Sequence, residues 1–116
     1  MTPITYGYRP KIILTYPRNN DPKPPMTSEA IDLIWTERER QLAKGYDAAH
    51  DDARPAGALV DAALCHAITR NGENLRTAKK LWPFAQKFKP AATPKESVLL
   101  AASLLLAELE RMLRAE

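Results

Sequence analysis

The sequence predicts a mainly α-helical fold, in which a three-helix core follows an extended, proline-rich N-terminal arm. Six of the ten prolines fall within residues 1–26, and this spacing is incompatible with a helix. From residue 27 onward, apolar side chains recur at helical intervals between residues that are typical of helix ends. We therefore divide the chain into an arm over 1–26 and a helical domain over 27–116.

The arm contains one β-prone run, residues 11–16, which lies between two prolines. We expect this run to form a short strand, to pair with another subunit, or to lie extended along the helices, because the chain offers no good second strand. Residues 19–25 are rich in turn-forming residues and are expected to be a linker.

The first helix is expected from Ser28 to Lys44, with Thr27 as its N-cap and Gly45 just beyond its end. Arg38 falls in the middle of the apolar face of this helix. The apolar members of that face are Ile31, Ile34, Trp35 and Leu42. A guanidinium group in such a position has to be paired, because burying an isolated charge is costly.

The second helix is expected over residues 54–70, after a polar connection over 46–53, with Asp51 or Asp52 as its cap. Asn71 and Gly72 would end it. Its predicted apolar face is rich in alanine, which implies a close approach of another helix, and consists of Ala56, Leu59, Val60, Ala63, Leu64 and Ala67. A short helix over 73–81 would follow, ended by Trp82-Pro83-Phe84.

The third helix is expected to begin after Thr93 and to reach Leu113, because Thr93-Pro94-Lys95-Glu96 is a capping box with proline in the first turn. Its main stripe would face the core and consists of Val98, Ala102, Leu105, Leu109 and Met112. Leu100 and Leu104 lie on the opposite side. Three helices cannot easily cover both sides of one of them, so we expect a homo-oligomer that uses Leu100 and Leu104.

Charge is distributed unevenly along the chain. Residues 62–95 hold seven basic residues and one acidic residue, whereas the flanking segments are acidic. The basic side chains interleave with aromatic ones: Arg76, Lys79, Lys80, Lys87 and Lys89 with Trp82, Phe84 and Phe88. Either the aromatic residues close the end of the bundle and the lysines are solvated, or this segment binds an anion such as a nucleotide.

A second polar cluster combines residues 37–41 with His50-Asp51-Asp52. In one interpretation Arg38 joins the first helix to Asp51 or Asp52 as a structural clasp. In a second interpretation Arg38, Gln41, His50 and Asp51 line a pocket for a small ligand. A third interpretation, a metal-dependent phosphohydrolase, lacks the further upstream histidine that such His-Asp sites use.

Other residues limit the chemistry that the sequence supports. The single cysteine, Cys65, cannot form an internal disulfide and is typical of a reducing compartment; we expect it to be a packing residue and His66 to lie at a helix edge. The longest near-apolar run, Val98 to Ala107, is too short to span a membrane. No glycine-rich phosphate loop or paired-acid motif is present. We expect no metal, no cofactor and no catalytic residue.

Several of these residues together resemble a group of small bacteriophage and prophage proteins, over roughly residues 35–113. The shared pattern is Glu-Arg-x-Arg-Gln, Gly followed by Trp or Tyr, His-Asp-Asp and Trp-Pro-aromatic. The matching positions are Glu37, Arg38, Arg40, Gln41, Gly45, Tyr46, His50, Asp51, Asp52, Gly57, Leu59, Cys65, Trp82, Pro83, Phe84 and 107–111. Ala58 and His66 depart from it, because the group has glutamate and tyrosine there.

The resemblance implies viral origin and action in the cytoplasm of a bacterial host. We therefore expect a phage accessory protein without catalytic activity that counters host defence, either by occluding a defence complex or by sequestering a nucleotide signal. Its expected partners are a second copy and either a host protein complex or an anionic nucleotide. The alternatives are a metal-dependent, all-α nucleotide (pyro)phosphohydrolase and a nucleic-acid-binding regulator; the second lacks helix-turn-helix spacing.

Overall fold

The computed structural model describes residues 28–116, and the predicted arm with its strand over 11–16 lies outside this range. The described residues form five helices joined by turns and loops, and they contain no strand. Its elements are α1 (Ser28–Ala43), α2 (Ala48–Asp52), α3 (Ala58–Ile68), α4 (Leu75–Leu81) and α5 (Pro94–Arg114). No helix in this part of the chain is long and apolar enough to cross a bilayer.

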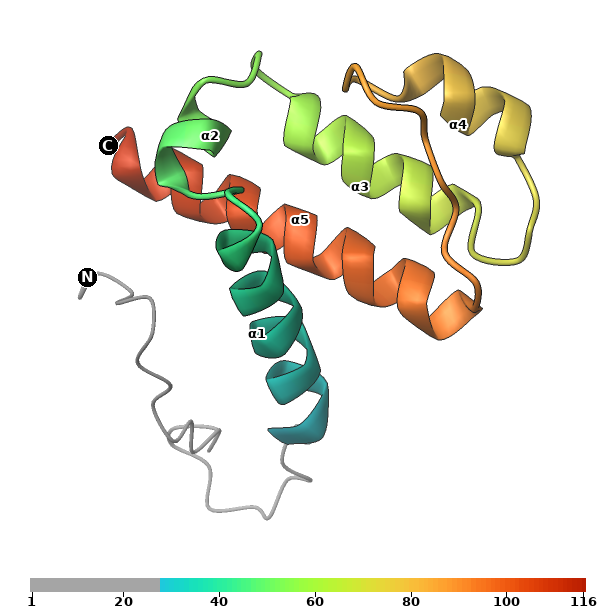
Figure 1. Cartoon of the computed structure of the whole chain (residues 1–116), viewed down its shortest axis with the longest axis horizontal. Coiled ribbons are helices and arrows are strands. Elements are labelled where there is room, and N and C mark those ends of the chain that lie inside the picture. Colours follow the sequence, from blue (N-terminus) through green and yellow to red (C-terminus); the bar gives the residue numbers. More distant parts are fainter. Residues whose placement is uncertain (1–27) are drawn as a thin grey trace, which may run out of the picture.

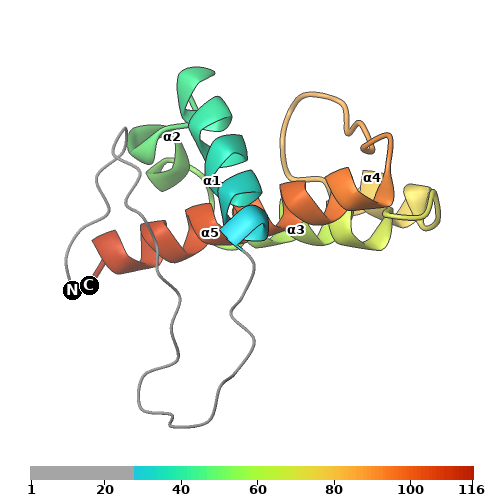
Figure 2. The ribbon, with the colours of Figure 1, turned by 90° about the horizontal axis from the view of Figure 1, so that it is seen from below.

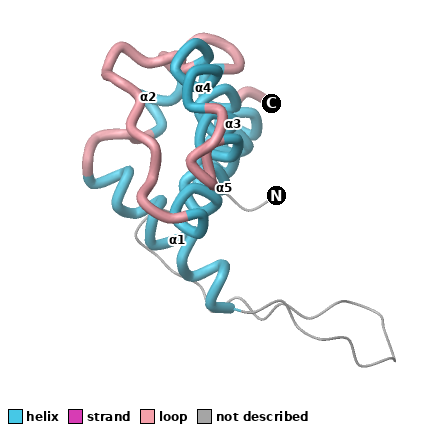
Figure 3. The backbone as a smooth tube through the Cα atoms, turned by 90° about the vertical axis from the view of Figure 1, so that its right-hand side faces the viewer, coloured by secondary structure: helices cyan, strands magenta, loops and turns pink. Residues whose placement is uncertain are grey.

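Helices α3 and α5 lie side by side and antiparallel, and they form the most extensive contact of the fold (Figure 1). Helix α1 crosses α5, α2 also packs on α5, and α4 packs on α3. Viewed at right angles, α1 and α2 rise from one side of the α3–α5 layer (Figure 2). A long loop over residues 82–93 connects α4 to the start of α5 (Figure 3).

The predicted helix ends are confirmed where the sequence carries clear caps. Thr93 Oγ1 accepts a hydrogen bond from Glu96 N at 3.1 Å, with Pro94 in the first turn of α5. Gly45, with φ of 99°, follows the end of α1 in a left-handed conformation that glycine adopts without strain.

The region between α1 and α3 differs from the prediction. The expected polar connection contains α2, and Asp47 caps it by accepting from His50 N at 3.0 Å. Helix α3 begins at Ala58 rather than at 54, because Gly57 has a φ of 85° and separates the preceding turn from the helix. The expectation that Asp51 or Asp52 would cap this helix is therefore wrong.

The core is built mainly from small side chains of α3 and their neighbours. Cys65 and Ala78 are fully buried and pack with Phe88, against which Ile68 and Trp82 are partly buried. The packing role of Cys65 is thus confirmed, and Phe88 is part of the same core cluster.

Two expectations about α3 are wrong. His66 is only 7% exposed, so it is a buried residue rather than one at the helix edge. Val60 and Leu64, predicted to face the core, are 41% and 43% exposed. The buried face of α3 is instead the one formed by Ala58, Leu59, Ala62, Ala63, Cys65 and His66.

The predicted orientation of α5 is also wrong. The large residues of the stripe that was expected to face the core point outward instead, and Leu105 and Leu109 are 49% and 53% exposed. The buried positions carry small or polar side chains, namely Ser97, Ala101, Ser103, Ala107, Glu108 and Glu110. Small residues allow α3 to approach α5 closely, and Ser103 satisfies its hydroxyl by donating to Leu99 O at 2.8 Å.

Candidate functional site

A buried arginine joins three helices on one side of the α3–α5 layer. Arg38, on α1, is 4% exposed. Its Nη2 donates to Asp51 Oδ2 on α2 at 2.9 Å, and its Nε donates to Glu110 Oε1 on α5 at 3.0 Å. Nη1 donates to the carbonyl of Tyr46 at 3.1 Å and to Gln41 Oε1 at 3.3 Å. This group, called the Arg38 clasp below, fixes α1 and α2 against α5.

The predicted pairing of Arg38 with Asp51 is therefore confirmed, whereas Asp52 pairs with Arg114 instead, at 2.9 Å. The sequence did not predict Glu110 as the second carboxylate, because it lies 72 residues away from Arg38. Two carboxylates around one guanidinium occupy its hydrogen-bonding groups, so Arg38 acts as a support for the site.

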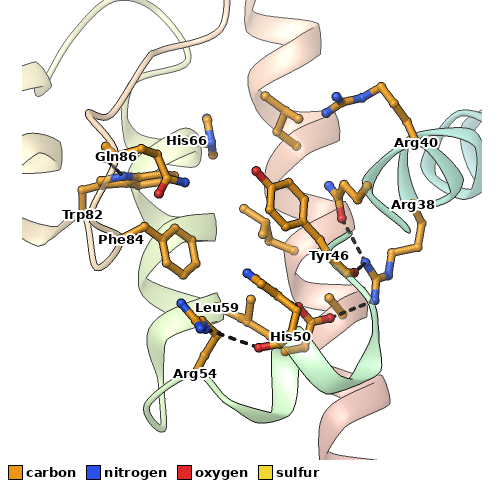
Figure 4. Close-up of a pocket in the computed structure, with 15 residues that line it drawn as sticks. Arg38, Arg40, Tyr46, His50, Arg54, Leu59, His66, Trp82, Phe84 and Gln86 are labelled. Atoms are coloured by element: carbon orange, nitrogen blue, oxygen red, sulfur yellow. Dashed lines mark hydrogen bonds and ion pairs between the residues drawn. The ribbon is translucent and has the colours of Figure 1, made fainter. Parts of the chain in front are cut away.

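A pocket of about 240 Å³ opens beside the clasp (Figure 4). One wall comes from α1 and the α2 region, and the facing wall from α3 and the loop after α4. Apolar side chains of α3 and α5 complete the lining. The lining residues are Arg38, Arg40, Gln41, Tyr46, His50, Asp51, Arg54, Leu59, His66, Trp82, Phe84, Gln86, Leu100, Leu104 and Ala107.

The aromatic wall is held in place by ring contacts. Phe84 and His66 each meet Trp82 edge to face, with ring centroids 5.2 Å and 5.6 Å from that of Trp82. Trp82 Nε1 donates to the carbonyl of Gln86 at 2.8 Å, which closes the loop around the ring. In Figure 4 the Phe84 and Tyr46 rings project toward the space between the two walls. Flat apolar surfaces of this kind suit a planar ligand.

Two arginines line the pocket, and they differ in their ion pairing. Arg40 is paired with Glu37, a contact that raises the pKa of the guanidinium. Arg54 donates Nε to the carbonyl of His50 at 3.3 Å and forms no ion pair within residues 28–116. The terminal nitrogens of Arg54 are therefore available to an anion.

The two histidines of the pocket differ in environment. His50 Nδ1 lies 3.0 Å from Asp51 Oδ1, so Nδ1 carries the proton and Nε2 is left for other contacts. Burial lowers the pKa of His66, and its buried Nδ1 has no hydrogen-bond partner in the part of the chain that the structure describes. His66 is thus a neutral imidazole in the aromatic wall.

The pocket combines the Arg38 cluster with two aromatic residues, Trp82 and Phe84, of the basic and aromatic cluster. Of the candidate residues, Arg38, Gln41, His50, Asp51 and Trp82 line this one pocket. Gln41 and Asp51 are buried with the clasp, at 6% and 1% exposed, whereas His50 is half-buried.

The basic candidates lie elsewhere. Arg76, Lys79 and Lys80 line a separate, open depression of about 420 Å³ on α4. Lys87 and Lys89 are exposed on the loop and belong to neither cavity.

The sequence does not predict four of the polar and aromatic lining residues, Tyr46, Arg54, His66 and Gln86, nor the apolar ones from α3 and α5. No group of three His, Cys, Asp or Glu side chains within residues 28–116 is placed to hold a metal ion. Comparisons with protein-family models, curated proteins and solved structures find no match for this chain.

Proposed function

We propose that this chain is a non-catalytic phage accessory protein that binds a mononucleotide-like ligand in the pocket beside the Arg38 clasp. In a bacterial host such binding would sequester a nucleotide signal of a defence system. The observation that carries the proposal is the combination, in one pocket, of facing aromatic side chains with Arg54, which forms no ion pair within residues 28–116. Aromatic surfaces stack on bases, and guanidinium groups bind phosphate.

The size of the pocket favours a ligand with one base. Its volume of about 240 Å³ is somewhat below the usual range of roughly 300–1,000 Å³ for ligand sites. One base between Tyr46 and Phe84 would fill the apolar part and leave the phosphate near Arg54. A cyclic dinucleotide would have to leave its second base outside.

The engagement of Asp51 favours binding over hydrolysis. One carboxylate oxygen of Asp51 accepts from Arg38 and the other faces His50 Nδ1. In addition, Ala58 stands where the similar phage proteins have glutamate. The carboxylates that a phosphohydrolase would use are thus either committed to the clasp or replaced.

Calorimetric titration of the full chain with AMP, ATP and a cyclic dinucleotide tests the proposal. We expect AMP to bind with one site per chain. Phe84→Ala and Arg54→Gln should each weaken binding by roughly ten-fold, since a base stack is worth about 1–3 kcal/mol. Lys79→Ala/Lys80→Ala is the matched control, because it removes two charges outside the pocket and should leave affinity unchanged. Absence of binding, or equal binding by the Phe84 variant, would refute the proposal.

The same samples test the two alternatives. We expect every nucleotide to be recovered intact after incubation with Mg²⁺ or Mn²⁺. Metal-dependent turnover that is lost in Asp51→Asn would establish the phosphohydrolase instead. Salt-sensitive binding of an oligonucleotide that is lost in Lys79→Ala/Lys80→Ala would favour the nucleic-acid-binding regulator.

A further inference from the structure

The outer face of α5 carries an apolar stripe, called the α5 stripe below. Its large members are about half exposed: Val98 at 53%, Leu105 at 49%, Leu109 at 53% and Met112 at 56%. With Ala102 they repeat at intervals of four and three residues, the spacing of a coiled-coil seam. The stripe covers about 21 Å of helix at 1.5 Å per residue.

The stripe itself carries no charge between Val98 and Met112, although Lys95 precedes it by one turn and the buried Glu108 borders it on one side. Leu99, Leu106 and Leu113 flank it on one side and are partly buried. The acidic and basic residues of α5 lie outside it, and Glu108 and Glu110 are buried toward the protein, in pairs with Arg111 and Arg38. Helix α1 crosses α5 but does not cover this stripe. The four large residues of the stripe remain about half exposed.

We propose that a second copy of this chain docks on the α5 stripe, with α5 packing against α5 about a two-fold axis. In such an interface each group near the axis meets its own copy, so a charge there would oppose its like. A helix face without charges from 98 to 113 is suited to this arrangement. Apolar residues at alternating intervals of four and three pack against a second helix that has the same intervals. Helix α5 of another copy is such a helix.

Self-association through this stripe leaves the ligand pocket open. Leu100, Leu104 and Ala107 line the pocket from the side of α5 that lies opposite Leu105 and Leu109 on the helix. The dimer would present two separate pockets. This inference therefore does not depend on the proposed function.

Light scattering of the full chain at micromolar concentration provides the first test. We expect a mass twice the 13.0 kDa of one chain. Leu105→Glu/Leu109→Glu should give the mass of one chain with an unchanged helical circular dichroism spectrum, because both side chains already face solvent in the protomer. Leu33→Glu, at a leucine of α1 that is 37% exposed, is the control outside the stripe and should remain a dimer. A wild-type mass of 13.0 kDa at all concentrations would overturn the proposal.

Cross-linking identifies what covers the stripe. Cys65 is the only cysteine and is fully buried, so Leu105→Cys introduces a single accessible thiol. A bismaleimide should link two chains of this variant and leave Leu33→Cys largely unlinked. A Leu105→Cys chain that stays monomeric while its thiol is protected from a maleimide would show that residues 1–27 of the same chain cover the stripe, which would also overturn the proposal.

Discussion

Replacing Arg38 by alanine tests the structural claim on which the pocket depends. The substitution leaves two carboxylates without their cation: Asp51, at 1% exposed, and Glu110, at 6% exposed. It also removes the donor to the carbonyl of Tyr46. Removing one partner of a buried ion pair costs about 3–5 kcal/mol, because a charge remains buried without compensation.

The expected loss is large enough to measure by thermal unfolding. For a domain of this size each kcal/mol lowers Tm by roughly 4–8 °C, so Arg38→Ala should melt at least about 12 °C below wild type. Arg40→Ala is the matched control on the same helix, since its pair with Glu37 is exposed and should contribute less than about 1 kcal/mol.

A second substitution separates the buried charges from the lost packing. Adding Asp51→Asn and Glu110→Gln to Arg38→Ala removes both carboxylate charges that Arg38 paired with. This triple variant should recover part of the lost Tm. Equal melting temperatures for the Arg38 and Arg40 variants would refute the clasp as a structural device.

Three further predictions follow from single groups. Burial lowers the pKa of His66 below its ordinary 6.5, so the unfolded chain binds a proton that the folded chain does not. The contribution of His66 to the free energy of unfolding should therefore be complete above pH 6.5 and should fall as the pH drops toward the lowered pKa. In His66→Phe this pH-dependent change in Tm should be absent. Burial also raises the pKa of the Cys65 thiol, so a thiol reagent should label the native chain only as fast as it opens. Thr93→Ala should cost about 1 kcal/mol in urea unfolding by removing the cap of α5.

The helices could be predicted because their signals are local. Thr93 and Gly45 mark helix ends through the hydrogen bond and the backbone conformation that these residues favour. Helix α2 could not be predicted in the same way, because five residues are too few to show the period of a helix.

The orientation of α5 could not be predicted, because periodicity shows that a helix has an apolar face but not what covers it. The largest stripe was expected to face the core, yet the core uses small residues such as Ser97 and Ala101, which let α3 come close. Burying large side chains and bringing two helices close together are alternative ways to pack α5. The sequence of α5 alone does not show which of them the fold uses.

Only the part of the candidate site that is close in sequence to Arg38 could be predicted. An arginine on an apolar face requires a carboxylate, and Asp51 is near in sequence. Its second carboxylate, Glu110, and the aromatic wall that faces His50 come from distant parts of the chain. Contacts of that kind depend on the fold rather than on any local pattern.

The most direct test of the central claim is a nuclear magnetic resonance titration of the ¹⁵N-labelled full chain with AMP. The claim is that one pocket holds a planar anion between its aromatic walls, with the phosphate at Arg54. The account predicts saturable shifts of the Trp82 indole N–H and of the Tyr46 and Arg54 signals, with Lys79 and Lys80 unmoved. Shifts confined to the signals of Lys79 and Lys80, or no saturable shift at all, would contradict it.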